Sequence, residues 1–393
     1  MIKNKRGWQK CLISDKDGRI YTIPSNLEII VEYDDKMRTI WYDQFHERYV
    51  ASENSPFRPR NSRFLDSTSF ADISRHLEEE YGFRITSSSM EERILTLIDG
   101  KRAFHPIQNF ILSEKWDCVP RVDTLLIDYL GAEDTQLNRL ITRKWMAAVV
   151  ARIFQSGTKF DHVLTLTGPE GTGKSTLFRM LAGDWFNDTF SFSFDQKQLR
   201  EAISAKWIIE IAELSGLKKA EVAAAKAFIS ATEDTFRPAY GRVVETHPRQ
   251  CVFAATTNEE HFLRSITGDR RWWMVDVAGN GSVEKWLPCL TSNVHQIWAE
   301  AYSIYKSGEP LYLPENMEAE MRKVQQEHNF IGGSGILGEL EEWLETLLPC
   351  NWDSLSKDSR KYFFRGDLNP NILSSMPSKI ATSRQHRYNS IKT

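Results

Sequence analysis

One stretch of the chain has the residue types and spacing of a phosphate-binding loop. An apolar, β-branched run at 163–167 leads into a glycine-rich turn, and helix-forming residues follow from Leu177. Glycines let backbone N–H groups turn inward around phosphate oxygens, and the N-terminus of the next helix adds partial positive charge. In this pattern the lysine reaches the β- and γ-phosphates and the hydroxyl after it helps to bind Mg²⁺. The expected binding residues are Gly168, Pro169, Glu170, Gly171, Thr172, Gly173, Lys174, Ser175 and Thr176.

The alternative is a glycine-rich turn that binds nothing. The four fixed positions, Gly168, Gly173, Lys174 and Ser175, would arise by chance in about one chain in a hundred of this length at average composition. The alternative also requires the strand before the turn and the helix after it to be coincidences. We therefore expect this stretch to bind a nucleotide.

Hydrolysis of a nucleotide also needs groups that organise Mg²⁺ and the attacking water. Glu210 and Glu213 lie at or just past the end of the apolar run 207–211. We expect Glu213 to be the catalytic base, and we expect Ser175, Glu210 and Glu213 to supply the metal site. Ala212 stands where such motifs often have the first of two adjacent acids, which leaves the identity of the metal ligand open. Glu210 could instead be a carboxylate paired with another side chain.

Polar residues after the next apolar runs extend the set. Asn258 follows the run 251–256, where an amide can orient the attacking water or the γ-phosphate, although an asparagine there is often only a turn residue. Arg270 and Arg271 precede the run 272–277 and could supply an arginine finger, which is worth about 10³ to 10⁵ in rate where it operates. A surface ion pair is the alternative. Because such a finger usually acts on a neighbouring subunit, it would require an oligomer.

A candidate β-hairpin separates the acidic strand from the Asn258 strand, with strand-like residues on both sides of Gly241. Basic and aromatic residues on a projecting hairpin suit phosphate contact and base stacking. The tip of this hairpin would carry Arg242, with Arg237, Tyr240 and His247 nearby. A solvated charged loop is the alternative.

The elements that position these residues alternate between strands and helices, with an alanine-rich helix expected at 217–230. This order predicts a parallel sheet covered on both faces, with the functional residues at the carboxyl ends of its strands. Residues 27–33 could form a strand or a short helix, and 135–154 predicts a long amphipathic helix. The expected divisions are a mixed β-rich region at 1–60, a helical subdomain at 61–158, an ATPase core at 159–310, and a helical region with a polar tail at 311–393.

Composition restricts the class of protein. The 393 residues carry a net charge of −3, so any nucleic-acid contact must come from a local patch. Five scattered cysteines, without a Cys-x-x-Cys pair, suggest neither a zinc site nor a disulfide framework. The basic residues at the start are not followed by an apolar core, so we expect no secretory signal there, and no apolar run approaches the length of a membrane span. We expect a cytoplasmic protein that makes no membrane contact.

The ordered motifs resemble the virulence-associated protein E family of phages and bacterial mobile islands, a relative of the superfamily 3 helicases with an AAA+ fold. The resemblance covers about 110–280 and weakens towards 366. Its matching pieces are Trp116-Asp117 with Pro120-Arg121, 159–162, 168–175, 207–213, 237–242, 256–258 and 268–273.

This resemblance implies ATP and Mg²⁺ as cofactors, and ATP hydrolysis coupled to separation of, or translocation on, single-stranded or forked DNA in a hexameric homo-oligomeric ring. It implies that Lys174 and Ser175 form Walker A, Glu213 Walker B and Asn258 sensor 1, with Arg270 or Arg271 as the finger. It also implies that the segment with Lys226, Arg237 and Arg242 contacts DNA, with Tyr240 beside them. A nucleotide-dependent interaction protein that modulates a partner without unwinding is the main alternative, and a small-molecule kinase is a weaker one. Residues 1–110 contain no cluster of acidic residues of the kind found in a primase, so we do not expect priming activity.

Overall fold

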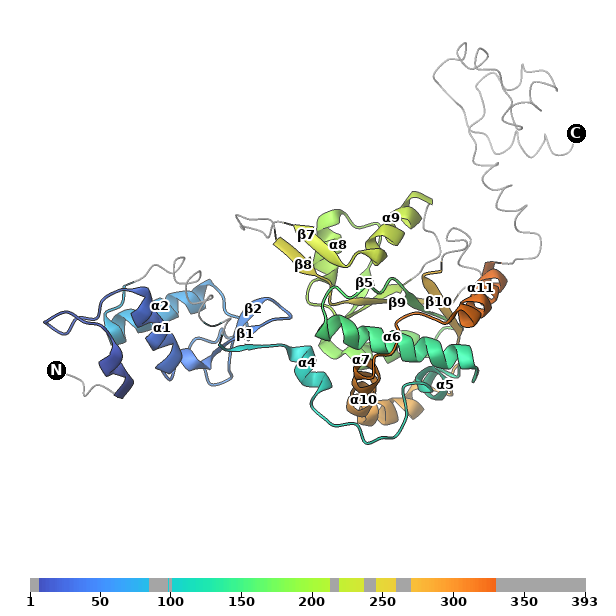
Figure 1. Ribbon diagram of the computed structural model, residues 1–393, viewed down its shortest axis with the longest axis horizontal. Helices are drawn as coiled ribbons and strands as arrows, with labels where there is room; N and C mark the ends of the chain where they lie inside the picture. Colours follow the sequence, from blue (N-terminus) through green and yellow to red (C-terminus); the bar gives the residue numbers. More distant parts are fainter. Residues whose placement is uncertain are drawn as a thin grey trace, which may run out of the picture.

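The computed structural model describes residues 7–84, 98, 101–212, 219–236, 245–258 and 270–329. Figure 1 shows the N-terminal residues, in blue, gathered in a small unit beside a larger core that is drawn from green to orange. Each part has its own cluster of buried apolar side chains. None of the helices within the described ranges is both long and apolar enough to cross a membrane.

A five-stranded parallel sheet forms the centre of the core. Its strands are β4 (Val163–Thr167), β5 (Phe186–Phe190), β6 (Ile208–Ala212), β9 (Val252–Thr257) and β10 (Trp272–Asp276). They lie in the order β10-β4-β9-β6-β5, so the fourth strand in the chain, β9, is inserted between the first and the third. The predicted α/β core with a parallel sheet is confirmed.

Helices cover both faces of this sheet, as Figure 1 shows: α8 and α9 lie above it, and α6, α7 and α10 below it. α6 (Gln136–Phe154) begins at the N-cap Thr135, whose hydroxyl accepts a hydrogen bond from Asn138 N, and it confirms the predicted long helix. α10 (Val283–Lys306) packs against both α6 and α7 (Lys174–Ala182). The remaining helices of the core are α4 (Pro106–Ile111), α5 (Leu125–Leu130), α8 (Gln196–Ile203), α9 (Lys219–Ser230) and α11 (Glu315–Asn329), with a short 3-10 helix at Gly183–Trp185.

In its described residues, the N-terminal unit combines the helices α1 and α2 with a small sheet in the order β2-β1-β3. Its elements are a 3-10 helix at Gly7–Cys11, α1 (Pro24–Tyr33), a second 3-10 helix at Met37–Thr39, β1 (Ile40–Asp43), β2 (Arg48–Ala51), α2 (Ser67–Tyr81) and β3 (Ala103–Phe104). The ambiguous stretch 27–33 is helical. Pro24 occupies the first turn, where its missing N–H costs nothing, and the buried Leu27, Ile30 and Val31 recur at helical spacing.

A buried carboxylate joins the helices of this unit. Asp34 Oδ1 accepts hydrogen bonds from the backbone N–H groups of Lys36 and Met37 at 2.9 and 2.8 Å, and the carboxylate also contacts the side chains of His76 and Tyr81 on α2. Burial acts to raise the pKa of Asp34, but these hydrogen bonds outweigh it and lower the pKa to about 2. The cluster around this residue extends from Leu12 to Ile98, on both sides of the division expected at residue 60.

The predicted hairpin is present in its two arms. β7 (Glu233–Phe236) pairs antiparallel with β8 (Glu245–Pro248), in a register that places Asp234 opposite His247. The Arg249 guanidinium, just after β8, forms two hydrogen bonds with the Asp234 carboxylate and lies over the Phe228 ring of α9. These contacts fix the base of the hairpin to the core.

Candidate functional site

The glycine-rich loop follows β4 directly and opens into α7. Gly168 has φ +156°, and a Cβ there would lie 2.0 Å from Val277 O, so only glycine fits between β4 and the chain after β10. Gly173 has φ +91°, and a Cβ there would lie 2.5 Å from the Trp286 ring of α10. The two glycines therefore let the loop turn while it packs closely against the core.

Lys174 lies at the first position of α7, with its side chain folded over the loop. Its Nζ donates hydrogen bonds to Gly168 O and Pro169 O at 2.7 and 2.8 Å, and to Asn258 Oδ1 at 2.9 Å. Burial lowers the pKa of Lys174, against the attraction of the Glu210 and Glu170 carboxylates, which raises it. A cation is thereby placed where the loop would hold phosphate oxygens.

Glu210 faces the start of α7 from the middle of β6. Its Oε1 accepts hydrogen bonds from Ser175 Oγ at 2.6 Å and from Thr256 Oγ1 at 2.5 Å. The residue is 1% exposed, and its Oε2 is buried without a hydrogen-bond partner. A buried carboxylate oxygen without a partner is costly, so it points to a ligand that the carboxylate binds, and hard oxygen donors of this kind suit Mg²⁺.

The order of the strands explains why these residues meet. Because β9 lies between β4 and β6, the carboxyl end of β9 brings Thr256 beside Glu210 and Asn258 beside Lys174. Residues from three segments far apart in the chain thus converge at one edge of the sheet. We expected Asn258 to follow the next core strand after that of Glu210. These two strands, β9 and β6, are neighbours in the sheet.

Two groups of predicted site residues lie partly or wholly outside the described residues. Glu213, the predicted base, is in the segment 213–218, and Arg237, Tyr240 and Arg242 are in the segment 237–244. Lys226 is described and is half-buried on α9.

Arg270 and Arg271 do not lie at the carboxyl edge of the sheet, where we expected the functional residues to gather. Arg271 O accepts a hydrogen bond from Val163 N at 2.7 Å, which places the pair at the amino end of β4. The five residues of β4 separate it from the loop, about 16 Å at 3.3 Å per residue. The reason is that both arginines precede their strand, whereas the other motifs follow theirs.

The environments of the two arginines differ. Arg271 Nε donates to Ser230 Oγ at 2.9 Å, and its side chain is 22% exposed. Arg270 is 67% exposed. Both guanidinium groups lie 3.9 Å from the buried Asp161 carboxylate. The pair therefore lies at the edge of its own sheet that is opposite the glycine-rich loop.

Sequence reasoning did not single out Thr256 or Asp161. Thr256 belongs to the quoted motif 256–258, but its contact with Glu210 depends on β9 lying next to β6. Asp161 belongs to a quoted motif, 159–162, but its two arginine partners are more than a hundred residues away in sequence.

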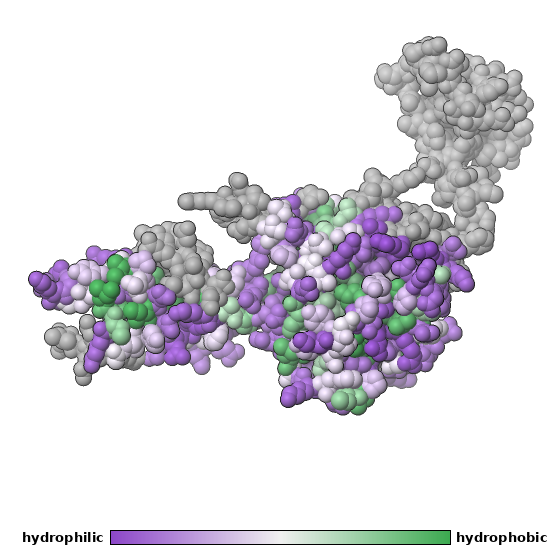
Figure 2. Space-filling view, in the orientation of Figure 1, coloured by the Kyte–Doolittle hydropathy of each residue, from purple (hydrophilic) through white to green (hydrophobic). Residues whose placement is uncertain are grey.

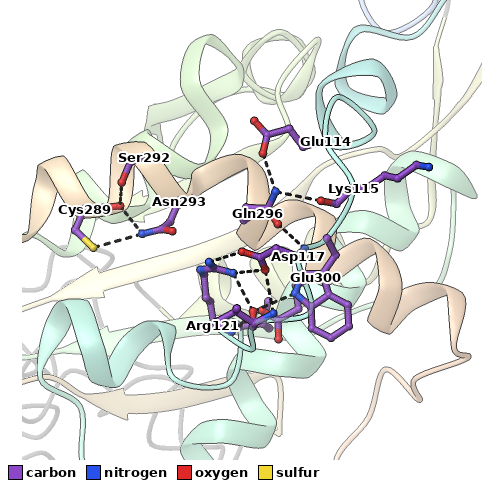
Figure 3. A network of polar contacts seen from close by, with 12 residues as sticks. Glu114, Lys115, Asp117, Arg121, Cys289, Ser292, Asn293, Gln296 and Glu300 are labelled. Carbon is purple, nitrogen blue, oxygen red and sulfur yellow. Dashed lines mark hydrogen bonds and ion pairs between the residues drawn. The ribbon is translucent and has the colours of Figure 1, made fainter.

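The motif Trp116-Asp117 with Pro120-Arg121 forms a loop that is fixed to α10, as Figure 3 shows. Arg121 forms two hydrogen bonds with Asp117, which lower the pKa of that carboxyl to about 2. The buried Glu300 accepts hydrogen bonds from Arg121 N at 2.6 Å and Val122 N at 2.9 Å, and burial raises the pKa of Glu300. These contacts give the motif a structural role, because they hold the connection between α4 and α5 against α10.

The sequence profile of the virulence-associated protein E-like domain matches residues 111–330, more than half of the chain. The chain belongs to this family. The match includes the loop at Trp116, the glycine-rich loop, Glu210, Asn258 and the arginine pair.

Solved structures also show similarity to this virulence-associated protein E-like chain. An apo structure of the NrS-1 C-terminal region has a TM-score of 0.43 at 14% identity, covering 92% of this chain and 83% of that chain. JCV helicase has a TM-score of 0.26 at 10% identity, covering 69% of this chain and 84% of that chain. Comparison with curated protein sequences gave no match.

Proposed function

We propose that this protein is an ATP-dependent motor of the superfamily 3 helicase type, which acts on single-stranded or forked DNA in the replication of a phage or mobile element. The observation that carries the proposal is the convergence of Lys174, Ser175, Glu210 and Asn258 at one edge of the sheet. Membership of the virulence-associated protein E-like family supports the replicative context.

The chain supplies distinct groups for each part of hydrolysis. The loop amides, the start of α7 and the Lys174 ammonium would bind the phosphates, and Asn258 sets the position of that ammonium through a hydrogen bond of 2.9 Å. Glu213, three residues beyond Glu210 in sequence, would act as the base that takes the proton of the attacking water.

The residues present fit a magnesium ion. Glu210 Oε2 is buried and without a partner, and the neighbouring Ser175 hydroxyl is the second oxygen donor. Together they would hold Mg²⁺, which when bound with the nucleotide neutralises charge on the phosphate oxygens. Thr256 keeps the Glu210 carboxylate turned towards α7.

The position of the arginine pair favours an assembly. Arg270 and Arg271 lie at the edge of the sheet opposite the loop, so they cannot reach the nucleotide of their own chain without a large rearrangement. A second copy placed with its amino edge against the first copy's loop would complete the site. We propose a homo-oligomer, with a hexameric ring as the arrangement that the family resemblance implies.

The decisive experiment compares Lys174→Ala with Lys197→Ala, which removes an exposed lysine of α8. We expect ATP hydrolysis, its stimulation by single-stranded DNA, and unwinding of a forked duplex to be lost in Lys174→Ala and kept in Lys197→Ala. Mass in solution, measured with nucleotide and DNA, should show an oligomer.

Hydrolysis that does not respond to DNA, in a chain that stays monomeric with both ligands, would contradict the proposal. Hydrolysis with assembly but without unwinding by the unmodified protein would instead support a nucleotide-dependent interaction protein.

A further inference from the structure

A face of the small N-terminal sheet carries exposed cations and rings that the proposed ATPase site does not use. In the β1–β2 register, Trp41 pairs with Val50 and Asp43 with Arg48, and an isolated bridge places Phe64 next to Val50. Residues paired directly across antiparallel strands point to the same side, as do residues two apart on one strand. Trp41, Arg48 and Phe64 therefore share one face.

The rings and cations on this face are already arranged together. The Arg48 guanidinium lies 4.5 Å from the centre of the Phe64 ring, and that of Arg63 lies 5.0 Å from it. Both arginines remain exposed to solvent, and Trp41 is 42% exposed, which is unusual for a residue of its size. The face thus presents guanidinium groups beside an accessible indole ring.

Charge on this part of the chain favours an anionic partner. Residues 36–63 contain six basic and three acidic residues, in a protein whose overall charge is −3. One of those acids, Asp43, is fully buried: it accepts hydrogen bonds from His46 and lies 3.5 Å from the Arg63 guanidinium. Arg63 is thus paired with Asp43 on one side, but the side chains of both Arg48 and Arg63 remain exposed, so an anionic ligand can reach them from solvent. Figure 2 shows hydrophilic surface over the part of the N-terminal unit that lies next to the core.

This face adjoins the base of the β7–β8 hairpin. Glu47, in the turn between β1 and β2, lies 3.0 Å from His247 of β8. Its φ of +51° is a left-handed conformation that is uncommon for glutamate. A cavity of about 100 Å³ separates the two parts, lined by Phe45 and Glu47 on one side and by Lys206 and His247 on the other. The basic face therefore begins where the hairpin is attached.

We propose that Trp41, Arg48 and Arg63 form a second contact for single-stranded nucleic acid, with the guanidinium groups binding phosphates and the indole stacking on a base. A single strand is the fitting ligand because its bases are free to stack, whereas the bases of a duplex are covered. The inference deepens the proposed function: a strand engaged by the hairpin would continue across the N-terminal unit.

The test measures binding of fluorescent oligo(dT) to the full chain by anisotropy, without nucleotide, so that it does not depend on hydrolysis. The variants are Arg48→Gln with Arg63→Gln, and separately Trp41→Ala. The matched control is Arg19→Gln with Arg75→Gln, which removes the same two charges from exposed positions outside this sheet. All replaced side chains are exposed, and thermal unfolding checks that each variant is folded.

We expect the Arg48/Arg63 variant to reduce the slope of log K against log[salt] by about 1.4, since each phosphate contact on a single strand contributes about 0.7. The same slope predicts binding about 25-fold weaker at 0.1 M salt. Trp41→Ala should weaken binding about fivefold or more, the lower bound for loss of one stacked base. The control should change binding little.

Equal binding by the Arg48/Arg63 variant and its control would overturn the proposal. The proposal would also be overturned if the Arg48/Arg63 variant lost binding to duplex and single strand equally and Trp41→Ala had no effect. The face would then attract any polyanion. If the unmodified protein hydrolyses no ATP but these binding differences persist, the proposed function fails while the nucleic-acid contact stands.

Discussion

Replacing Glu210 by glutamine tests whether this residue binds the metal. The substitution keeps the length of the side chain and an oxygen that can accept from Ser175 and Thr256, but it removes the negative charge. The buried Oε2 that lacks a partner becomes an amide nitrogen, which cannot bind a cation. The variant should therefore bind ADP but lose the additional stabilisation that Mg²⁺ supplies.

The size of the effect follows from linkage. A ligand present at 100 times its dissociation constant stabilises the folded state by about 2.7 kcal/mol. For a folding unit of 150–250 residues, each kcal/mol raises Tm by about 2–4 °C, so Mg²⁺ added to the ADP complex should raise Tm by about 5–11 °C. In Glu210→Gln this rise in Tm should fall below about 2 °C, because most of the stabilisation by bound Mg²⁺ is lost. The rate of ATP hydrolysis should fall by about 10²–10³, as for removal of one preorganised electrostatic group.

The assay is thermal unfolding with ADP, with and without Mg²⁺, alongside steady-state hydrolysis. Glu201→Gln is the control, since it removes an exposed glutamate from α8. Glu213→Gln separates the two acids: as the predicted base it should lose hydrolysis but keep the rise in Tm with Mg²⁺. A full rise in Tm in Glu210→Gln, together with its loss in Glu213→Gln, would refute the assignment and reverse the two roles.

Two further predictions concern buried carboxylates outside the proposed ATPase site. Asp34→Ala should destabilise the N-terminal unit by about 3–5 kcal/mol, because it leaves buried polar partners such as Tyr81 unpaired. The pKa of Asp34 is lowered to about 2 in the folded protein. The stability that ionised Asp34 contributes is therefore complete above its unfolded pKa of about 4 and is lost as pH falls towards 2. Urea unfolding at a series of pH values measures this loss, and an equal pH dependence in the unmodified protein and Asp34→Ala would contradict the prediction. Glu300→Gln should change the free energy of unfolding by less than about 1 kcal/mol, because an oxygen that accepts from Arg121 N and Val122 N remains. Glu300→Leu leaves these two N–H groups without an acceptor, and each should cost about 1–3 kcal/mol of stability. Equal unfolding free energies for the two Glu300 variants would show that these hydrogen bonds do not hold the loop.

Several features of this protein could be predicted from sequence because they depend on neighbours along the chain. The glycine-rich loop is contiguous, so the spacing of Gly168, Gly173 and Lys174 already specified a strand, a tight turn and a helix. The periodicity of 135–154 predicted α6, and strand-like residues on both sides of Gly241 predicted the paired arms β7 and β8. Local propensity and spacing control such elements.

The tertiary structure decided which distant residues meet. The sequence assigned Glu210 and Asn258 to two different apolar runs. Only the insertion of β9 between β4 and β6 places Glu210 beside Ser175 and Asn258 beside Lys174. It also put Arg270 and Arg271 at the opposite edge, because side chains before and after parallel strands lie at different ends of the sheet. The order of strands in a sheet depends on packing between segments that are remote in the chain, and a linear pattern of residues does not encode it locally.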